Sequence, residues 1–204
     1  MMEALKIDKD LEWLRKVSKE VNVGKDDLTE DIKVLEEYCL SHGVFAMAAI
    51  QLGIDKRIVY IKNTRLDKVE DDNWNEGTVL INPVIKKREG LTQYWEACAS
   101  CLDNTGLVLR PYKILIHYVD LLGKKHQKTF TGFPATVFSH EYDHLDGILH
   151  MDKAIDLKVM TKEERKEFRK THDYEVFHKT GDFLELEKEY GKRSKNKCDA
   201  YIRS

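Results

Sequence analysis

The feature that most restricts how this chain can fold is a polar motif set inside an apolar stretch. The motif, at residues 140–144, reads HEYDH. The apolar side chains around it are Phe133, Val137, Phe138, Leu145, Ile148 and Leu149. We predict a helix over residues 134–146, because Pro134 suits the first turn of a helix and Gly147 suits the position just after one. The apolar flanks predict that this helix is buried, where histidines and carboxylates need partners.

His140 and His144 are spaced to bind one metal ion. Residues four apart on a helix lie about 40° apart around its axis, so both imidazoles can reach the same ion. Glu141 lies about 100° further round and can reach a water on the ion without being a ligand. This arrangement is typical of metal-assisted hydrolysis of a small carbonyl substrate, with a carboxylate moving the proton. The alternative is an ordinary helix with two histidines, and Asp143 is expected only to orient a neighbour or cap the helix.

Two histidines do not complete a metal site, so a third ligand has to come from elsewhere in the chain. Downstream, His150, Glu163 and Glu164 have no telling spacing. Upstream, a thiolate from residues 95–101, WEACASC, would make a His2Cys site with an open fourth position. Cys98 and Cys101 together would instead allow a closed Cys2His2 structural site, whereas a redox pair lacks a thioredoxin-like pattern around it. Spacing alone does not separate the open site from the closed one.

The remaining helices are predicted near the two ends of the chain. Apolar spacing predicts helices over residues 8–21 and 28–42, the second capped by Asp27 and ended by Gly43. The tail from Lys153 onward is heavily charged, and we expect it to form solvated helices docked on one face.

The strands are predicted between these helices. β-branched runs predict strands over residues 57–62 and 78–87, with a polar turn at 71–77. Pro111 splits residues 107–121 into two strand-like runs, and a turn at 122–124 leads to a returning strand over 127–130. The order predicts an α+β fold, with antiparallel β-sheets packed around a central metal-binding helix. We expect a metallohydrolase domain over residues 1–153 and a charged helical C-terminal extension over residues 154–204.

Composition limits the classes of partner and compartment. Charged residues make up 34% of the 204 residues and the formal net charge is −2, so the composition gives no argument for nucleic acid or membrane. Four scattered cysteines are too few for a disulfide scaffold, which favours a reducing compartment. The N-terminal segment is charged throughout and no stretch approaches a membrane span in length. We therefore expect a cytoplasmic protein.

Three segments together resemble the peptide deformylase family, which carries the motifs GxGxAAxQ, EGCLS and HExDH in this order. Residues 140–144, HEYDH, match the third motif in full, and residues 96–100, EACAS, resemble the second with alanines at two positions. Residues 44–51, VFAMAAIQ, resemble the first without either glycine, and Gly43 lies one place too early to replace one. Arg110 follows Cys98 at the interval typical of the family. The similarity covers residues 28–153.

The resemblance implies a site and a reaction. Cys98, His140 and His144 would hold one divalent ion, natively Fe²⁺, with Zn²⁺, Ni²⁺ or Co²⁺ as alternatives. The implied reaction removes the N-formyl group from the initiator methionine of nascent chains, with transient contact to the ribosome.

Roles follow for individual residues. Glu141 would move the proton, while the Gln51 side chain and the Ala99 backbone N–H would hold the oxyanion. Glu96 would pair with Arg110 beside the ligand loop. The residues expected to contact substrate are Phe45, Ala46, Glu96, Ala135 and Phe138. Two alternatives remain: a zinc-stabilised, non-catalytic relative that binds nascent N-termini, and a hydrolase of another small formyl or acyl amide.

Overall fold

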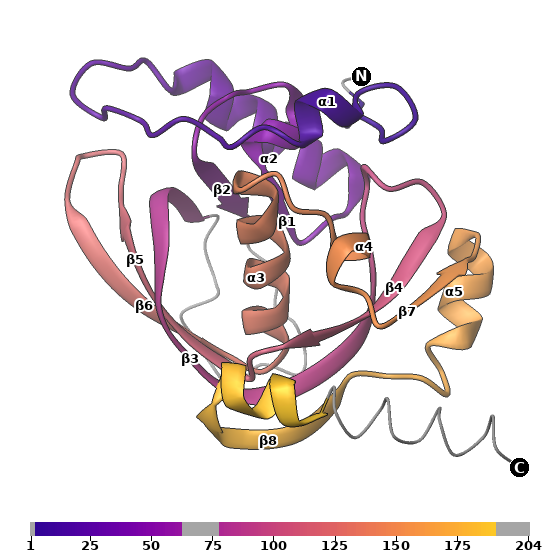
Figure 1. The fold of residues 1–204 in the computed structure, drawn as a ribbon. Coiled ribbons are helices and arrows are strands. Elements are labelled where there is room, and N and C mark those ends of the chain that lie inside the picture. The colour runs from indigo at the N-terminus through magenta and orange to yellow at the C-terminus, as the bar shows by residue number, and fades with distance from the viewer. Residues whose placement is uncertain (1–2, 63–77, 191–204) are drawn as a thin grey trace, which may run out of the picture.

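The fold is a strongly curved sheet wrapped around one central helix (Figure 1). The computed structural model describes residues 3–62 and 78–190; the polar turn predicted at 71–77 lies outside them. The central helix is α3, Phe133–Leu145, one residue from the predicted bounds at each end. It carries the HEYDH motif into the interior. None of the described helices is long and apolar enough to span a bilayer.

One long strand organises the sheet. The described strands are β1 Ala46–Ala48, β2 Ile58–Ile61, β3 Thr78–Ala97, β4 Asn104–Arg110, β5 Lys113–Val119, β6 Lys125–Thr131, β7 Asp156–Val159 and β8 Glu175–Asp182. All pairings are antiparallel, and β3 pairs with β2, β4, β5 and β8. The strand predicted over 78–87 is the first half of β3, which continues to residue 97. The predicted α+β fold with antiparallel strands around a buried helix is confirmed.

The sheet near β1 and β2 is covered on both faces. Alternate β2 residues point to opposite sides, as the pleat requires. Val59 and Ile61 join the apolar cluster that contains Phe138 of α3, whereas Ile58 and Tyr60 join a cluster with Leu35 of helix α2, Thr29–His42. Helix α2 lies within the range predicted from its apolar spacing, and Gly43 ends it in the left-handed conformation. Strand β1 likewise has Ala46 and Ala48 in the first cluster and Met47 in the second, so it is packed on both faces beside the site.

The helix predicted over residues 8–21 is wrong for most of its length. Only α1, Leu11–Leu14, is helical. The next residues run past the end of α3, where the Ser18 backbone N–H donates to the Leu145 carbonyl at 2.8 Å. The Val21 backbone N–H likewise donates to Asn82 Oδ1 at 2.8 Å. Backbone groups bonded to distant elements cannot form the hydrogen bonds of a helix.

Glycines allow two of the tight connections. Gly123 has φ of 77° in the turn between β5 and β6, which confirms the predicted hairpin. Gly147 has φ of 69°, and a Cβ there would lie 2.3 Å from the Arg15 carbonyl oxygen. Only glycine permits this contact between the end of α3 and the N-terminal segment.

The tail contains helices, as predicted, and also two strands that were not. Its described helices are α5 Lys162–Phe168 and a helical segment at residues 183–190, and the short helix α4, His150–Lys153, lies just before them. Strand β7 pairs with β4, and β8 pairs with β3 (Figure 1). All residues of β7 and nearly all of β8 are exposed, so neither strand has a buried apolar face. Without the alternation of apolar and polar residues, the sequence did not predict them as strands. The division into units 1–153 and 154–204 stays a prediction.

Candidate metal centre and active site

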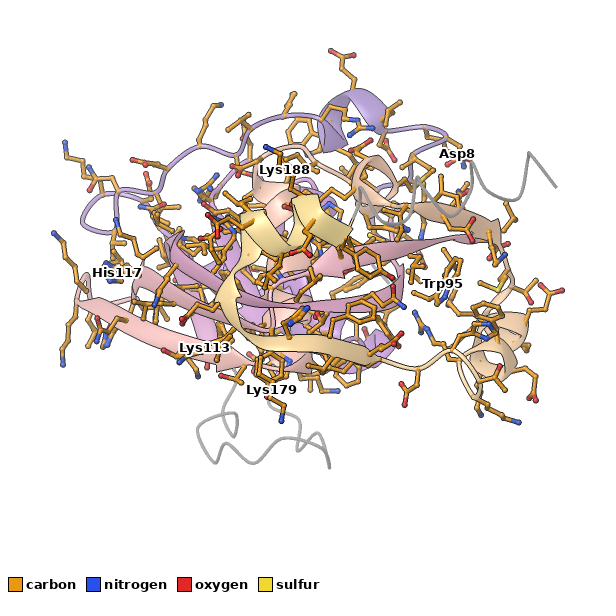
Figure 2. The ribbon with its side chains drawn as sticks, turned by 60° about the horizontal axis from the view of Figure 1, so that its bottom comes forward. Asp8, Trp95, Lys113, His117, Lys179 and Lys188 are labelled. Atoms are coloured by element: carbon orange, nitrogen blue, oxygen red, sulfur yellow. The ribbon has the colours of Figure 1, made fainter. Side chains whose placement is uncertain are left out.

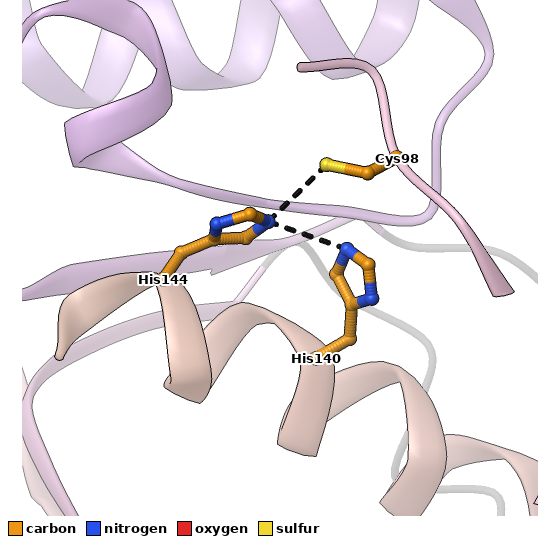
Figure 3. A group of neighbouring side chains, drawn as sticks. All are labelled: Cys98, His140 and His144. Carbon is orange, nitrogen blue, oxygen red and sulfur yellow. Dashed lines mark hydrogen bonds between the residues drawn. The ribbon is translucent and has the colours of Figure 1, made fainter. Parts of the chain in front are cut away.

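Three side chains from two segments bring their donor atoms to one point (Figure 3). Cys98 directly follows β3, and His140 and His144 lie one turn apart on α3. The Cys98 Sγ lies 3.2 Å from His144 Nε2, which lies 3.3 Å from His140 Nε2. Among the described residues these three form the one group of at least three possible ligands. The structure therefore brings together the three ligands that the family resemblance implied.

Other candidate ligands lie outside this group. Cys101 is fully buried and shares an apolar cluster with Cys98, but it is not among the residues whose donor atoms converge, so the described residues do not form the closed Cys2His2 site. His150 is buried with its ring centroid 5.7 Å from that of His140. Glu163 and Glu164 are exposed on α5. A three-residue donor set leaves a coordination position open, as catalytic metal sites require.

His140 is oriented by a buried carboxylate. Its Nδ1 lies 2.8 Å from Glu96 Oε2. Burial raises the pKa of Glu96, but the charge and hydrogen bonds of Arg110 and the bond from His140 outweigh it and hold the pKa well below its usual value. An ionised carboxylate only accepts, so His140 Nδ1 donates and Nε2 keeps its lone pair for an ion.

An ion-pair network supports Glu96 from behind. Arg110 donates through Nε to Glu96 Oε1 at 2.7 Å and through Nη2 to Oε2 at 2.9 Å. Its Nη1 donates to Asp143 Oδ2, and Lys153 Nζ donates to Asp143 Oδ1 at 2.7 Å. The predicted Glu96–Arg110 pair is present, and it is buried, with 3% of the arginine side chain exposed. Asp143 thus orients the arginine, within the modest role expected for it.

The donor set fits a divalent ion. His144 Nδ1 is buried and has no hydrogen-bond partner among the described residues. The three converging atoms are a sulfur and two imidazole nitrogens, all within 4.8 Å of one another. The Cys98 Sγ also accepts from the Ser100 backbone N–H at 3.4 Å, a hydrogen bond that stabilises a thiolate. A thiolate with two imidazoles suits Fe²⁺, Zn²⁺, Co²⁺ and Ni²⁺. All three atoms can donate a lone pair to a cation, so their close approach is best explained by coordination of one ion.

Gln51 points its amide nitrogen at the metal ligands. It lies in the short 3-10 helix η1, Ala49–Leu52, and is 1% exposed. The Ala48 backbone N–H donates to Gln51 Oε1 at 3.2 Å. The amide Nε2 lies 3.3 Å from Cys98 Sγ and 3.2 Å from Ser100 Oγ. The backbone donor fixes which end of the amide faces the site, so Nε2 is available as a donor there.

Glu141 is a buried carboxyl with a perturbed pKa. Its Oε2 accepts a hydrogen bond from the Ala48 backbone N–H at 2.9 Å. Burial raises the pKa of Glu141 to about 7, against the lowering effects of His140 and of the Ala48 N–H. A carboxyl with a pKa near neutrality can both accept and return a proton.

A cavity of about 260 Å³ opens on these groups. Phe45, Ala46 and Glu96, three of the five predicted substrate contacts, line it together with Gln51 and Ala99.

The expectation for Ala135 and Phe138 is wrong. Both are fully buried in the apolar core and neither lines the cavity, since Phe138 stacks on Phe130 at 5.3 Å. The helical period turns residues 135 and 138 toward the sheet, and residues 133, 136 and 137 toward the cavity.

Several residues that line the cavity were missed in the sequence. They are Met47, Tyr94, Phe133, Thr136, Val137 and Arg169. The three on α3 were accessible from helical spacing, since residues 133, 136, 137 and 140 share one side of a helix. Tyr94 lies two residues before Glu96 on β3 and so points to the same face. Arg169 had no sequence signal, because its position depends on how the tail docks.

Comparisons with known proteins agree on one family. The model of the family described as "Polypeptide deformylase" matches residues 2–160. A peptide deformylase of Pelagibacter ubique is 35% identical over 147 residues, which cover 71% of this chain and 82% of the relative. One from Finegoldia magna is 35% identical over 145 residues, covering 71% and 85%.

Solved structures agree with the sequence relatives. A probable peptide deformylase from Synechococcus phage S-SSM7 superposes with a TM-score of 0.64 and 29% identity, covering 75% of this chain and 99% of that one. An inhibitor complex of the Plasmodium falciparum peptide deformylase gives a TM-score of 0.62 and 28% identity, covering 82% and 95%. With the Cys98, His140 and His144 group in place, this chain belongs to the peptide deformylase family of metal-dependent amide hydrolases.

Proposed function

We propose that the protein hydrolyses the N-formyl group of formylmethionyl nascent peptides and releases formate. The observation that carries this proposal is the open three-donor group, two of whose members line a cavity, flanked by a side-chain amide and a carboxyl with a pKa of about 7. A formyl carbon bears only a hydrogen, so it needs little room beside the glycine-poor segment at residues 44–47, which lines the cavity.

Cys98, His140 and His144 would hold the ion, and Fe²⁺ is the proposed native metal because the family resemblance implies it. When bound, such an ion lowers the pKa of water and polarises a carbonyl oxygen. Glu96 and Arg110 contribute indirectly, because they fix the ring of His140 and keep its Nε2 turned toward the other two donors.

The chain's own residues carry the proton and the developing charge. Glu141 would take the proton from the attacking water and deliver it to the leaving amine nitrogen. Gln51 Nε2 and the Ala99 backbone N–H would donate to the oxyanion, and one such donor is typically worth about 3–4 kcal/mol. Both residues line the cavity, beside Cys98.

The substrate side of the proposal uses the cavity wall. Phe45 and Ala46 would contact the methionine residue, together with Phe133, Thr136 and Val137 in place of the core residues first expected. Action on nascent chains implies transient contact with the ribosome in the cytoplasm.

The direct test measures formate release. Protein reconstituted anaerobically with Fe²⁺, or with Ni²⁺, is incubated with formyl-Met-Ala-Ser and, as a matched control, acetyl-Met-Ala-Ser. We expect one bound ion per chain, formate from the first peptide and little acetate from the second. Stoichiometric metal without formate release would contradict the enzymatic proposal and favour a non-catalytic relative. Faster release from other formyl or acyl amides would favour the second alternative.

A further inference from the structure

Arg169 lines the substrate cavity from a part of the chain that the family model does not match. The match ends at residue 160, whereas Arg169 directly follows α5. The same cavity contains Glu96, Cys98 and His140. An arginine therefore enters the substrate site from the tail, where the family motifs assign no function.

The guanidinium is held from one side. Arg169 donates through Nε to the Trp95 carbonyl at 3.2 Å and also through Nη2. Its central carbon lies 4.7 Å from the centroid of the Tyr94 ring. Figure 2 labels Trp95 on the side of the molecule where α5 docks, and its ring lies edge-on to Phe168 at 5.1 Å. These contacts fix the arginine while Nη1 makes no hydrogen bond within the described part of the chain.

The segment that follows Arg169 is also fixed against the cavity wall. The ring of Tyr174 lies 5.6 Å from that of Phe133, which lies 5.1 Å from that of Tyr94. Gln93 Nε2 donates to Glu175 Oε2 at 2.7 Å, where β8 begins to pair with β3. Arg169 is therefore anchored on both sides along the chain and does not depend on a free tail for its position.

The charge of Arg169 is not neutralised by an ion pair in residues 3–62 or 78–190. Glu96, the carboxylate that shares the cavity, is bonded by Arg110 through both oxygens. Burial lowers the pKa of Arg169, against smaller raising effects that include Tyr94, Glu96 and Asp173. A half-buried guanidinium without a bound carboxylate gains most from an anionic ligand.

We propose that Arg169 binds a carboxylate of the substrate, so that the protein favours formyl peptides with an acidic group close to the formylmethionine. This inference rests on the proposed deformylase function and specifies its substrate class. The carboxylate could be the free C-terminus of a very short peptide or an acidic side chain after the methionine. A guanidinium recognises both through the same paired N–H donors.

The experiment compares matched acidic and neutral substrates with metal-loaded protein. One pair is formyl-Met-Ala as the free acid and as the amide; the other is formyl-Met-Glu-Ala-amide and formyl-Met-Gln-Ala-amide. For the wild type we expect kcat/KM to be higher by about tenfold or more for the acidic member of at least one pair, mostly through KM. The pair that responds identifies the source of the carboxylate.

Three variants separate recognition from packing. Arg169→Gln should bring the ratio of kcat/KM for the acidic substrate to kcat/KM for the neutral one close to one. Arg169→Lys should restore part of this preference. Arg165→Gln is the matched control, because Arg165 lies on α5 and donates to Thr105 and the Met160 carbonyl without lining the cavity. Its ratio should equal that of the wild type.

Two results would overturn the inference. The first is a wild-type kcat/KM ratio near one for both substrate pairs. The second is a fall in kcat/KM of Arg169→Gln that is equal for all four substrates, which would indicate that Arg169 contributes only to packing. If no substrate releases formate, the proposed function fails instead. Calorimetric binding of Met-Ala acid and Met-Ala-amide then still decides the inference, which requires the wild type to bind the acid more tightly and Arg169→Gln to remove the difference.

Discussion

Replacing Arg110 by methionine tests the network behind the metal ligands. The change removes the three donors that bond Glu96 and Asp143, and 3% of the arginine side chain is exposed. Removing one partner of a buried ion pair typically costs about 3–5 kcal/mol, because the remaining charge stays buried. For a chain of this size each kcal/mol lowers Tm by about 2–4 °C, so we expect a fall of about 6–20 °C. Loss of the support for His140 should also weaken metal binding by about 10–100-fold.

The matched control is Lys153→Met. Lys153 bonds the same Asp143 carboxylate at 2.7 Å, but 41% of its side chain is exposed. Exposed pairs are worth about 0–1 kcal/mol, so this variant should unfold close to the wild type. The double variant Glu96→Gln, Arg110→Met should lose less stability than the sum of its single changes, because the buried Glu96 carboxylate is then absent and Asp143 keeps its bond from Lys153.

The measurements are thermal and urea unfolding of the metal-free proteins and competitive titration of the metal. Equal stabilities for Arg110→Met and Lys153→Met would refute the reasoning, since burial would then make no difference. The effect of pH has a fixed sign. The folded pKa of Glu96 lies below the ordinary value of 4.5, so its stabilisation is complete above that pH and is lost as the pH falls. The wild type should therefore lose more stability than Arg110→Met on acidification below about pH 4.5.

Three further substitutions test individual roles at the site. Glu141→Gln should keep one metal ion per chain, measured by elemental analysis, but lower kcat by about 10²–10⁴-fold; retained turnover would remove Glu141 from proton transfer. Gln51→Leu should lower kcat by about 10²–10³-fold with a smaller change in KM, and an effect confined to KM would contradict the oxyanion role. Cys98→Ser should lose metal while Cys101→Ser retains it; metal loss in both variants would revive the closed four-ligand site.

The sequence alone was sufficient for features that depend on neighbours along the chain. The helix around His140 and His144, the β5–β6 hairpin and the end of α2 at Gly43 follow local spacing and turn chemistry. The choice of Cys98 as the third ligand could not be made from spacing, because Cys98 and Cys101 could each supply a thiolate. The resemblance of three ordered motifs selected Cys98, and the geometry agrees.

Local patterns failed where long-range contacts outweighed them. Residues 15–21 have helical apolar spacing, yet their backbone groups bond to Leu145 and Asn82, so no helix continues there. Strands β7 and β8 have charged, exposed sequences, and they are strands because β4 and β3 offer open edges for pairing. Hydrogen bonds between segments far apart in sequence leave little trace in the periodicity of either one.

Side-chain environment was the other feature that only the tertiary structure decided. The sequence determined that residues 134–146 form a buried helix with two metal ligands, but not which of its other faces meets the cavity. Phe138 packs in the core against Phe130 of β6, whereas Val137 lines the cavity, because neighbouring residues of α3 point about 100° apart around its axis. Arg169 reaches the cavity because the tail returns to pair with β3. Both depend on how distant segments pack, which no local pattern specifies.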